Sequence, residues 1–332
     1  MREIIETYRT IEEELIYKVA DMFAKYENLD NDYFIKILDE MNILDNETLE
    51  IIAEISGKPL KVIKDKVKSL GYSSIDTPTF NEAFKKDIIH INPNSIDYAP
   101  VMDYHIKQIE RDIAYVQRQV KVGIYRDTYK AIKKAQMSVE LGVKSPNQAI
   151  VEAVSDIARK GITSDTFLRE GKEVHQGMES VVRRAVRTSF TNVMADMNEH
   201  LGKELDIDTW YMSQHLGART TGTGHENHAW WQGKIYTTKE LTTICGLGTD
   251  RGYLGYNCRH LARPHIEGVS VIVPPLLPMK ELERVYTLEQ KQRGLERAIR
   301  TTKREIEAMK ALKSVEAQEH IAKLERRKRS TS

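Results

Sequence analysis

Apolar residues recur every three or four positions through much of the chain, the interval that places side chains on one face of an α-helix. The first such run covers residues 4–23, and its opposite face is acidic. A second run extends from about Tyr98 to Leu141, where we expect a break near Gly123. Long amphipathic helices are therefore the main structural prediction for the first part of the chain.

Two further helices are predicted before residue 206. Ser145 followed by Pro146 is typical of an N-cap and a first-turn proline, and Gly161 is placed to end the helix that they begin. A long helix with a basic face is expected next, from about Thr166 to Leu205.

The last part of the chain has a different apolar spacing. Beyond the prolines at 274, 275 and 278, the spacing is three, four and seven residues, and it involves Val285, Leu288, Leu295, Ile299, Ile306 and Met309. Gln292 and Thr302 interrupt this seam. One interpretation is a single long solvated helix, and the other is a short coiled coil.

Rare residue types are concentrated between positions 200 and 268. This stretch holds all three tryptophans, both cysteines, six of the ten histidines and ten of the eighteen glycines. Within it, Asp208–His215 and Lys234–Tyr236 are expected to form strands, with Trp230 and Trp231 supplying aromatic area to a small core. The pattern predicts a compact module that contains β-structure.

The predicted fold class is mainly α with a small α+β domain toward the C-terminus. We divide the chain into an acidic helical region (1–95), a long-helix region (96–206), the compact His/Cys/Trp-rich module (207–275) and a basic helical tail (276–332).

Opposite charges at the two ends are hidden by a formal net charge of +1. Residues 1–60 carry 6 basic and 15 acidic side chains, whereas residues 280–332 carry 15 basic and 9 acidic ones. The final cluster is Arg326, Arg327, Lys328 and Arg329. It is a candidate for contacts with DNA phosphates, and a solvated disordered end is the alternative.

Neither export nor a membrane span is indicated. Acidic residues stand where a secretory signal carries positive charge, so we expect the protein to stay in the cytosol where it is made. The longest apolar stretch, residues 269–279, contains three prolines and is far shorter than the ~20 residues that cross a bilayer. In a reducing compartment, Cys245 and Cys258 are not expected to form a disulfide.

Residues 47–71 resemble a helix-turn-helix in spacing, with a turn at Gly57 and several lysines on the second helix. That helix lacks the arginine, asparagine or glutamine side chains that read base edges, and acidic residues precede it. A plain helical hairpin is favoured, and a DNA-binding regulator is the alternative.

Common enzyme signatures are absent from the sequence. There is no phosphate-binding Gly-Lys-Ser/Thr loop and no Gly-x-Ser-x-Gly elbow. His225 and His228 are three residues apart in a glycine-rich context, whereas a zinc-protease helix needs them four apart.

A different metal site is consistent with the residues present. His225 or His228, with His215, can meet Cys258 and His260, and these side chains offer the nitrogen and sulfur ligands that Zn²⁺ takes. Cys258 and His260 alternate, so an extended strand places both on the same face. Structural zinc is one interpretation, and hydrogen-bonded residues in a tight loop core are the other.

Three segments share a motif that contains His215, Gly217 and Arg219, then His228, Trp231 and Gly233, and finally Asn257, Cys258, Arg259 and His260. Together these segments resemble the minor capsid protein 2 family of tailed bacteriophages, a relative of the Mu F-like head-morphogenesis proteins. The resemblance covers nearly the whole chain. Residues 220–227 depart from the family pattern, and the Ala and Trp that follow favour His228 over His225 for the family position.

The resemblance implies a structural component of the virion and no enzyme. It implies a place inside the head near the portal, partners that include the portal protein, the major capsid protein and packaged DNA, and a stage in the host cytoplasm during assembly. A role in DNA ejection is a further implication.

An enzymatic alternative also starts from the module. A hydrolase or transferase would use His228 or His260 as a general base and Arg219 or Arg259 to bind an anion.

Overall fold

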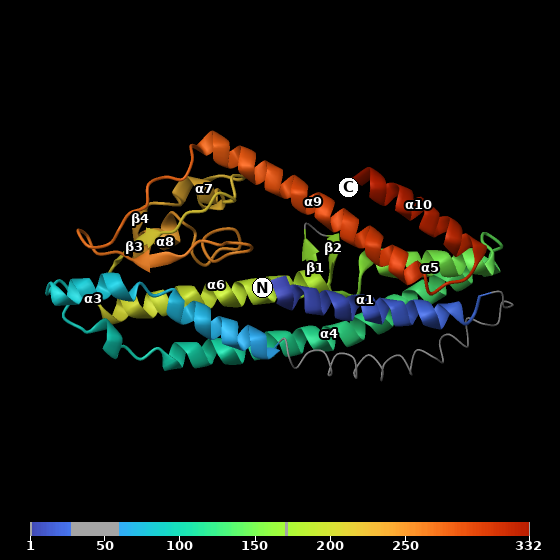
Figure 1. Cartoon of the computed structure of the whole chain (residues 1–332), viewed down its shortest axis with the longest axis horizontal. Coiled ribbons are helices and arrows are strands. Elements are labelled where there is room, and N and C mark those ends of the chain that lie inside the picture. Colours follow the sequence, from blue (N-terminus) through green and yellow to red (C-terminus); the bar gives the residue numbers. More distant parts are fainter. Residues whose placement is uncertain (1, 28–59, 170–171, 332) are drawn as a thin grey trace. The chain divides into compact units, whose positions relative to one another are not determined.

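The computed structural model describes residues 2–27, 60–169 and 172–331 (Figure 1). The prediction of a mainly α protein with a small α+β region near the C-terminus is confirmed. The chain divides into two compact units: unit 1 comprises residues 1–61, 112–183 and 293–332, and unit 2 comprises residues 62–111 and 184–292. The division into four regions along the sequence stays a prediction.

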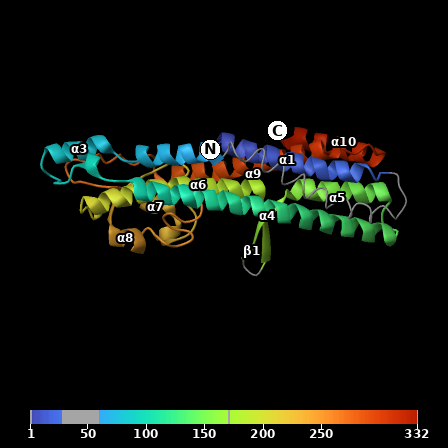
Figure 2. The ribbon, with the colours of Figure 1, turned by 90° about the horizontal axis from the view of Figure 1, so that it is seen from below.

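Unit 1 is built on the apolar face of helix α1 (Arg2–Ala24). The side chains on this face are buried: Ile4, Ile5, Tyr8, Ile11, Leu15, Ile16, Val19 and Phe23. Helices α1 and α10 (Val315–Thr331) both pack against α5 (Pro146–Lys160) (Figures 1 and 2). The first predicted amphipathic helix is therefore confirmed.

The ends of α5 follow the sequence prediction. The Ser145 side chain accepts a hydrogen bond from the main-chain N–H of Gln148, whose side chain accepts one from the Ser145 N–H. This reciprocal capping box, with Pro146 in the first turn, fixes where the helix begins. Gly161 ends the helix with a φ of +76°, a conformation that glycine adopts without strain.

Helix α4 (Ala99–Glu140) runs without the break that we expected near Gly123. A glycine inside a helix costs only about 1 kcal/mol relative to alanine, which is too little to end so long a helix. Its role is close approach, because a Cβ at this position would overlap the main-chain carbonyl oxygen of Thr163.

The expected helix from Thr166 is wrong over its first part. Residues before Met178 form an antiparallel hairpin of β1 (Thr163–Arg169) and β2 (Lys172–Gly177), and α6 (Met178–Glu204) follows. Figure 2 shows β1 projecting from the helices of unit 1. The sequence places glycines at 171 and 177, and glycine weakens a helix more than any residue except proline.

The tail forms two helices, α9 (Met279–Met309) and α10, where we considered one long helix or a short coiled coil. At residues 310–314 the chain turns, and the Glu27 carboxylate accepts hydrogen bonds from the main-chain N–H groups of Lys313 (2.6 Å) and Ser314 (3.0 Å). A carboxylate at this position satisfies donors at the start of α10, and its negative charge interacts favourably with the positive end of the helix dipole. A coiled coil with a second copy stays a prediction.

A buried ion pair joins three segments of unit 1. The Glu12 side chain is 1% exposed, and its carboxylate accepts hydrogen bonds from Arg304 Nη1 and from the Ile162 main-chain N–H, both at 3.0 Å. Arg304 also donates to the main-chain oxygens of Ala158 (2.6 Å) and Arg159 (3.2 Å), in the last turn of α5. The pair therefore holds α1, α9 and the end of α5 together.

Unit 2 contains a three-stranded antiparallel sheet in the order β4-β3-β5. The strands are β3 (Thr209–Met212), β4 (Ile235–Thr237) and β5 (Ala262–Pro264), so the two strands predicted in the module are confirmed. The short helices α7 (His228–Trp231) and α8 (Thr238–Thr243) accompany it (Figure 1). The core beneath is formed by Trp210, Met212, Trp231, Tyr236, Leu241, Cys245, Tyr253, Cys258 and Ala262.

Helix α6 supports this module within unit 2. The Trp210 ring packs so closely on Gly202 of α6 that a Cβ there would overlap it. At the same end of α6, Leu201 and Leu205 share a second core cluster with Phe80 and Ile266. Phe80 lies on α3 (Thr77–Lys85), which precedes a single 3-10 turn, η1 (Pro93–Ser95).

Only part of the predicted helix-turn-helix can be compared with the structure. Residues 47–59 lie outside the described residues, whereas residues 60–73 are helical, as expected for the second helix. Lys64 on this helix forms an ion pair with Glu110 of α4. Within the described ranges, no helix combines the length and apolar character that crossing a bilayer requires.

Candidate functional site

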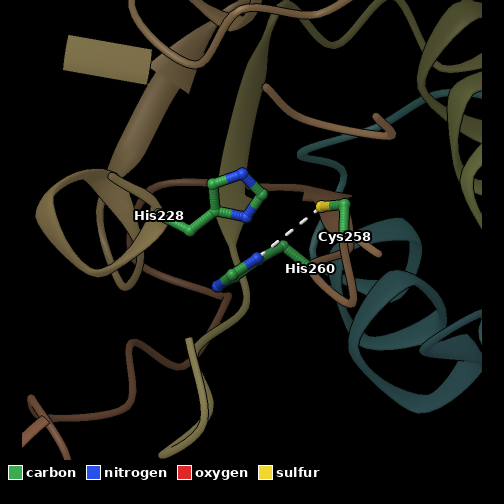
Figure 3. Close-up of side chains that lie close together, drawn as sticks. All are labelled: His228, Cys258 and His260. Atoms are coloured by element: carbon green, nitrogen blue, oxygen red, sulfur yellow. Dashed lines mark hydrogen bonds between the residues drawn. The ribbon is translucent and has the colours of Figure 1, made fainter. Parts of the chain in front are cut away.

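Three of the four predicted zinc ligands come together in the module of unit 2: His228, Cys258 and His260 (Figure 3). His228 is the first residue of α7, and the other two lie in the irregular segment 244–261 that leads into β5. One ligand atom from each residue lies within 4.8 Å of the others, and Cys258 Sγ is 3.7 Å from His260 Nδ1. All three side chains are buried.

Both imidazole rings are oriented by hydrogen bonds of their Nε2 atoms. His228 Nε2 lies 2.7 Å from the main-chain oxygen of Arg251, and His260 Nε2 lies 3.1 Å from Oε1 of Gln232. Gln232 Oε1 also accepts from the main-chain N–H of His215 at 3.0 Å, which identifies this atom as the amide oxygen. Because both partners are acceptors, each Nε2 carries the proton and each Nδ1 presents a lone pair.

Burial sets the protonation states of the cluster. It lowers the pKa of His228 to about 4 and holds the pKa of His260 well below its usual value, with nearby His and Arg side chains adding to the effect on His260. Burial also raises the pKa of the Cys258 thiol. At neutral pH and without a metal, the site therefore holds two neutral imidazoles and one thiol.

His215, the fourth predicted ligand, lies beside the cluster. Its ring packs on that of His260 with centroids 4.4 Å apart and an interplanar angle of 34°. The His260 ring is also in edge contact with the Trp231 ring, at 4.6 Å. His260 is thus enclosed by other rings of the same motif.

Arg219 holds the turn that precedes Cys258. Its guanidinium donates to the main-chain oxygens of Arg251 (2.8 Å) and Tyr256 (2.6 Å). The Arg251 oxygen is the one that His228 also contacts, so the arginine and the histidine fix the same carbonyl group. Arg259, in contrast, is exposed.

The remaining motif residues also shape the module. Trp231 is fully buried, and its Nε1 donates to the main-chain oxygen of His225 at 3.0 Å. A Cβ at Gly217 would lie 2.5 Å from Oε1 of Glu289 on α9. Gly233 and Asn257 have φ values of +71° and +61°, in the left-handed region that glycine and asparagine tolerate.

Sequence reasoning missed two supporting side chains. Gln232 orients His260, and the Tyr253 hydroxyl accepts from the main-chain N–H of Ala262 at 2.9 Å. Gln232 stands between the motif residues Trp231 and Gly233, and this position was a signal of its importance but not of its partner.

The predicted DNA-contact residues lie away from the module in sequence. Arg326, Arg327, Lys328 and Arg329 are on the last turns of α10. Lys328 forms an ion pair with Glu325 at 3.8 Å.

Comparison with known proteins places these features in a family. The chain matches the family model described as "Phage minor capsid protein 2" over residues 1–331. A protein of Lactococcus phage LL-H described as "Structural protein" is 23% identical over 302 residues, which cover 82% of this chain and 76% of that protein. No solved structure is significantly similar to the chain. With nearly every residue inside the family match, the chain belongs to the phage minor capsid protein 2 family.

Proposed function

We propose that the protein is a structural component of the phage head, located inside the head near the portal, where it assists head assembly. The observation that carries this proposal is the family match over residues 1–331. The portal protein and the major capsid protein are the proposed partners. The chain would be made in the host cytoplasm and enter the particle during assembly.

The module supports a structural role because its motif side chains are engaged in internal contacts. Arg219 donates to two main-chain oxygens, which engages its guanidinium within the module. His228 and His260 are 2% and 0% exposed, and a general base must come within hydrogen-bond reach of its substrate. We therefore favour a scaffold over a hydrolase or transferase.

The charge distribution supports the proposed surroundings. Residues 1–60 carry an excess of acidic side chains, which suits a basic protein surface, since complementary fields speed association. The basic last turns of α10 suit packaged DNA, and each phosphate contact there would make binding depend on salt. A contribution to DNA ejection follows if the protein leaves with the DNA.

Quantitative mass spectrometry of purified virions tests the proposal directly. We expect to detect the protein at low copy number and, after chemical cross-linking of the virions, in cross-links to the portal protein. We also expect it to be protected from added protease until the heads are opened. Virions that lack the protein, or digestion of the protein in intact heads, would contradict it.

Catalysis needs its own test. We expect head assembly to fail or slow when the module is destabilised, with no turnover of substrate by the purified chain. A saturable rate that is lost in His228→Ala or His260→Ala, with normal particles still formed, would support the enzymatic alternative.

A further inference from the structure

We propose that His228, Cys258 and His260 bind one Zn²⁺ ion that fastens the irregular segment 244–261 to α7. This inference concerns the module alone and does not depend on the location of the protein in the head.

The geometry of the three ligand atoms suits zinc. A Zn–S bond of about 2.3 Å and a Zn–N bond of about 2.05 Å at a tetrahedral angle place sulfur and nitrogen about 3.6 Å apart. Cys258 Sγ and His260 Nδ1 are 3.7 Å apart, and the whole set lies within 4.8 Å.

The ring orientations suit a metal equally well. Figure 3 shows His228 and His260 turned toward each other and toward the cysteine sulfur. Each Nε2–H is bound to an oxygen outside the cluster, at Arg251 or Gln232, so each Nδ1 lone pair remains for the cluster. Histidines that bind metals typically donate their other ring N–H to a carbonyl or carboxylate in this way.

The segment that carries two of the ligands has no regular secondary structure of its own. Residues 244–261 contain turns but no helix or strand, and irregular segments of this length are usually functional. Leu254 has a φ of +60°, which is strained for a branched side chain. A bond from Cys258 and His260 to a metal held by α7 would offset this strain.

Zinc binding releases one proton from the site. Zn²⁺ binds thiolate, so the Cys258 thiol releases its proton to solvent as the Zn–S bond forms, while both imidazoles bind in their neutral form. Soft and borderline ligands of this kind favour zinc over magnesium or calcium. Three protein ligands leave a fourth position for a solvent molecule.

Metal analysis of the full chain tests the site. After equilibration with zinc and gel filtration, we expect about one zinc per folded chain. Cys258→Ala should lower zinc affinity at least about tenfold, because the loss of even an outer-shell partner of a ligand typically costs that much. Cys245→Ala is the matched control, because Cys245 is a buried thiol of the same core that lies outside the cluster. It should retain the zinc.

Cobalt substitution keeps the test decisive if Cys258→Ala does not fold. The chain has two cysteines, so in Cys245→Ala a sulfur-to-cobalt charge-transfer band can come only from Cys258. We expect that band together with the visible spectrum of tetrahedral Co²⁺. A folded chain with less than about 0.1 zinc per molecule, a cobalt complex without the band, or zinc loss in Cys245→Ala equal to that in Cys258→Ala would overturn the proposal.

Discussion

Removing Arg304 tests the buried ion pair that holds unit 1 together. Arg304→Met keeps most of the aliphatic volume but leaves the Glu12 carboxylate, which is 1% exposed, without its counter-charge. Breaking a buried pair by deleting one partner typically costs about 3–5 kcal/mol. Two main-chain oxygens at the end of α5 also lose a donor.

The destabilisation caused by Arg304→Met should increase as pH rises. Burial raises the pKa of Glu12 above its usual value even beside Arg304, and loss of the arginine raises it further. When the pKa of a carboxyl group is higher in the folded than in the unfolded state, its protonation stabilises the fold. This contribution is complete below the unfolded-state pKa of about 4.3 and is lost as pH rises through the folded-state pKa. Arg304→Met is therefore expected to be more destabilising at pH 8 than at pH 5.

The assay is urea unfolding followed by far-ultraviolet circular dichroism, with hydrogen exchange of peptides from α1 and α5 as the local measurement. Arg300→Met is the matched control, because the same change one turn earlier on α9 removes only pairs at 3.7 and 3.9 Å from a side chain that is 30% exposed. We expect it to cost under about 1 kcal/mol.

Glu12→Gln provides the rescue. Added to Arg304→Met, it removes the uncompensated charge while keeping an acceptor for the Ile162 main-chain N–H, so stability at pH 8 should recover by about 2 kcal/mol. A cost equal to that of Arg300→Met, no dependence on pH, or no rescue would refute the reasoning.

Four further substitutions test other contacts. Gly123→Ala should destabilise by about 1–3 kcal/mol because its methyl group would overlap a main-chain oxygen. Gly294→Ala, at a helix position with open space, should instead stabilise by about 0.5–1 kcal/mol. If urea unfolding shows that Gly123→Ala and Gly294→Ala change the free energy of unfolding in the same direction, this pair of predictions is contradicted. Gly202→Ala should destabilise unit 2 by about 1–3 kcal/mol. An unchanged unfolding transition in tryptophan fluorescence would contradict the close packing of Trp210 on Gly202. Arg219→Gln should increase hydrogen exchange of residues 250–258 at least about tenfold, while unchanged exchange would show that the guanidinium does not hold the turn.

Local sequence signals predicted the elements whose stability is itself local. The apolar period of α1 and the capping box of α5 are contained in a few neighbouring residues, and both predictions are confirmed. The strands β3 and β4 were also predicted from short aromatic and polar stretches.

Contacts between distant residues explain the differences. The turn between α9 and α10 is capped by Glu27, a residue at the other end of the chain, so the local apolar spacing did not reveal this contact. Gly123 is ambiguous for the same reason: a helix glycine fits either a break or a close approach, and only the position of Thr163 decides between them. The β1–β2 hairpin depends on pairing that helix-like residue types in this segment conceal.

The residue types of the module motif follow from the number and direction of their hydrogen bonds. Arg219 contacts two main-chain oxygens at once, which a lysine ammonium does less well because it lacks a planar fork of donors. A neutral imidazole combines a donor and an acceptor on one rigid ring, and His228 and His260 use the donor on the surrounding protein. The acceptors are thereby directed at Cys258, so the contacts that stabilise the module also create a potential ligand set. Sequence spacing identified the members of this set, but the carbonyl and amide oxygens that orient them became apparent only with the fold.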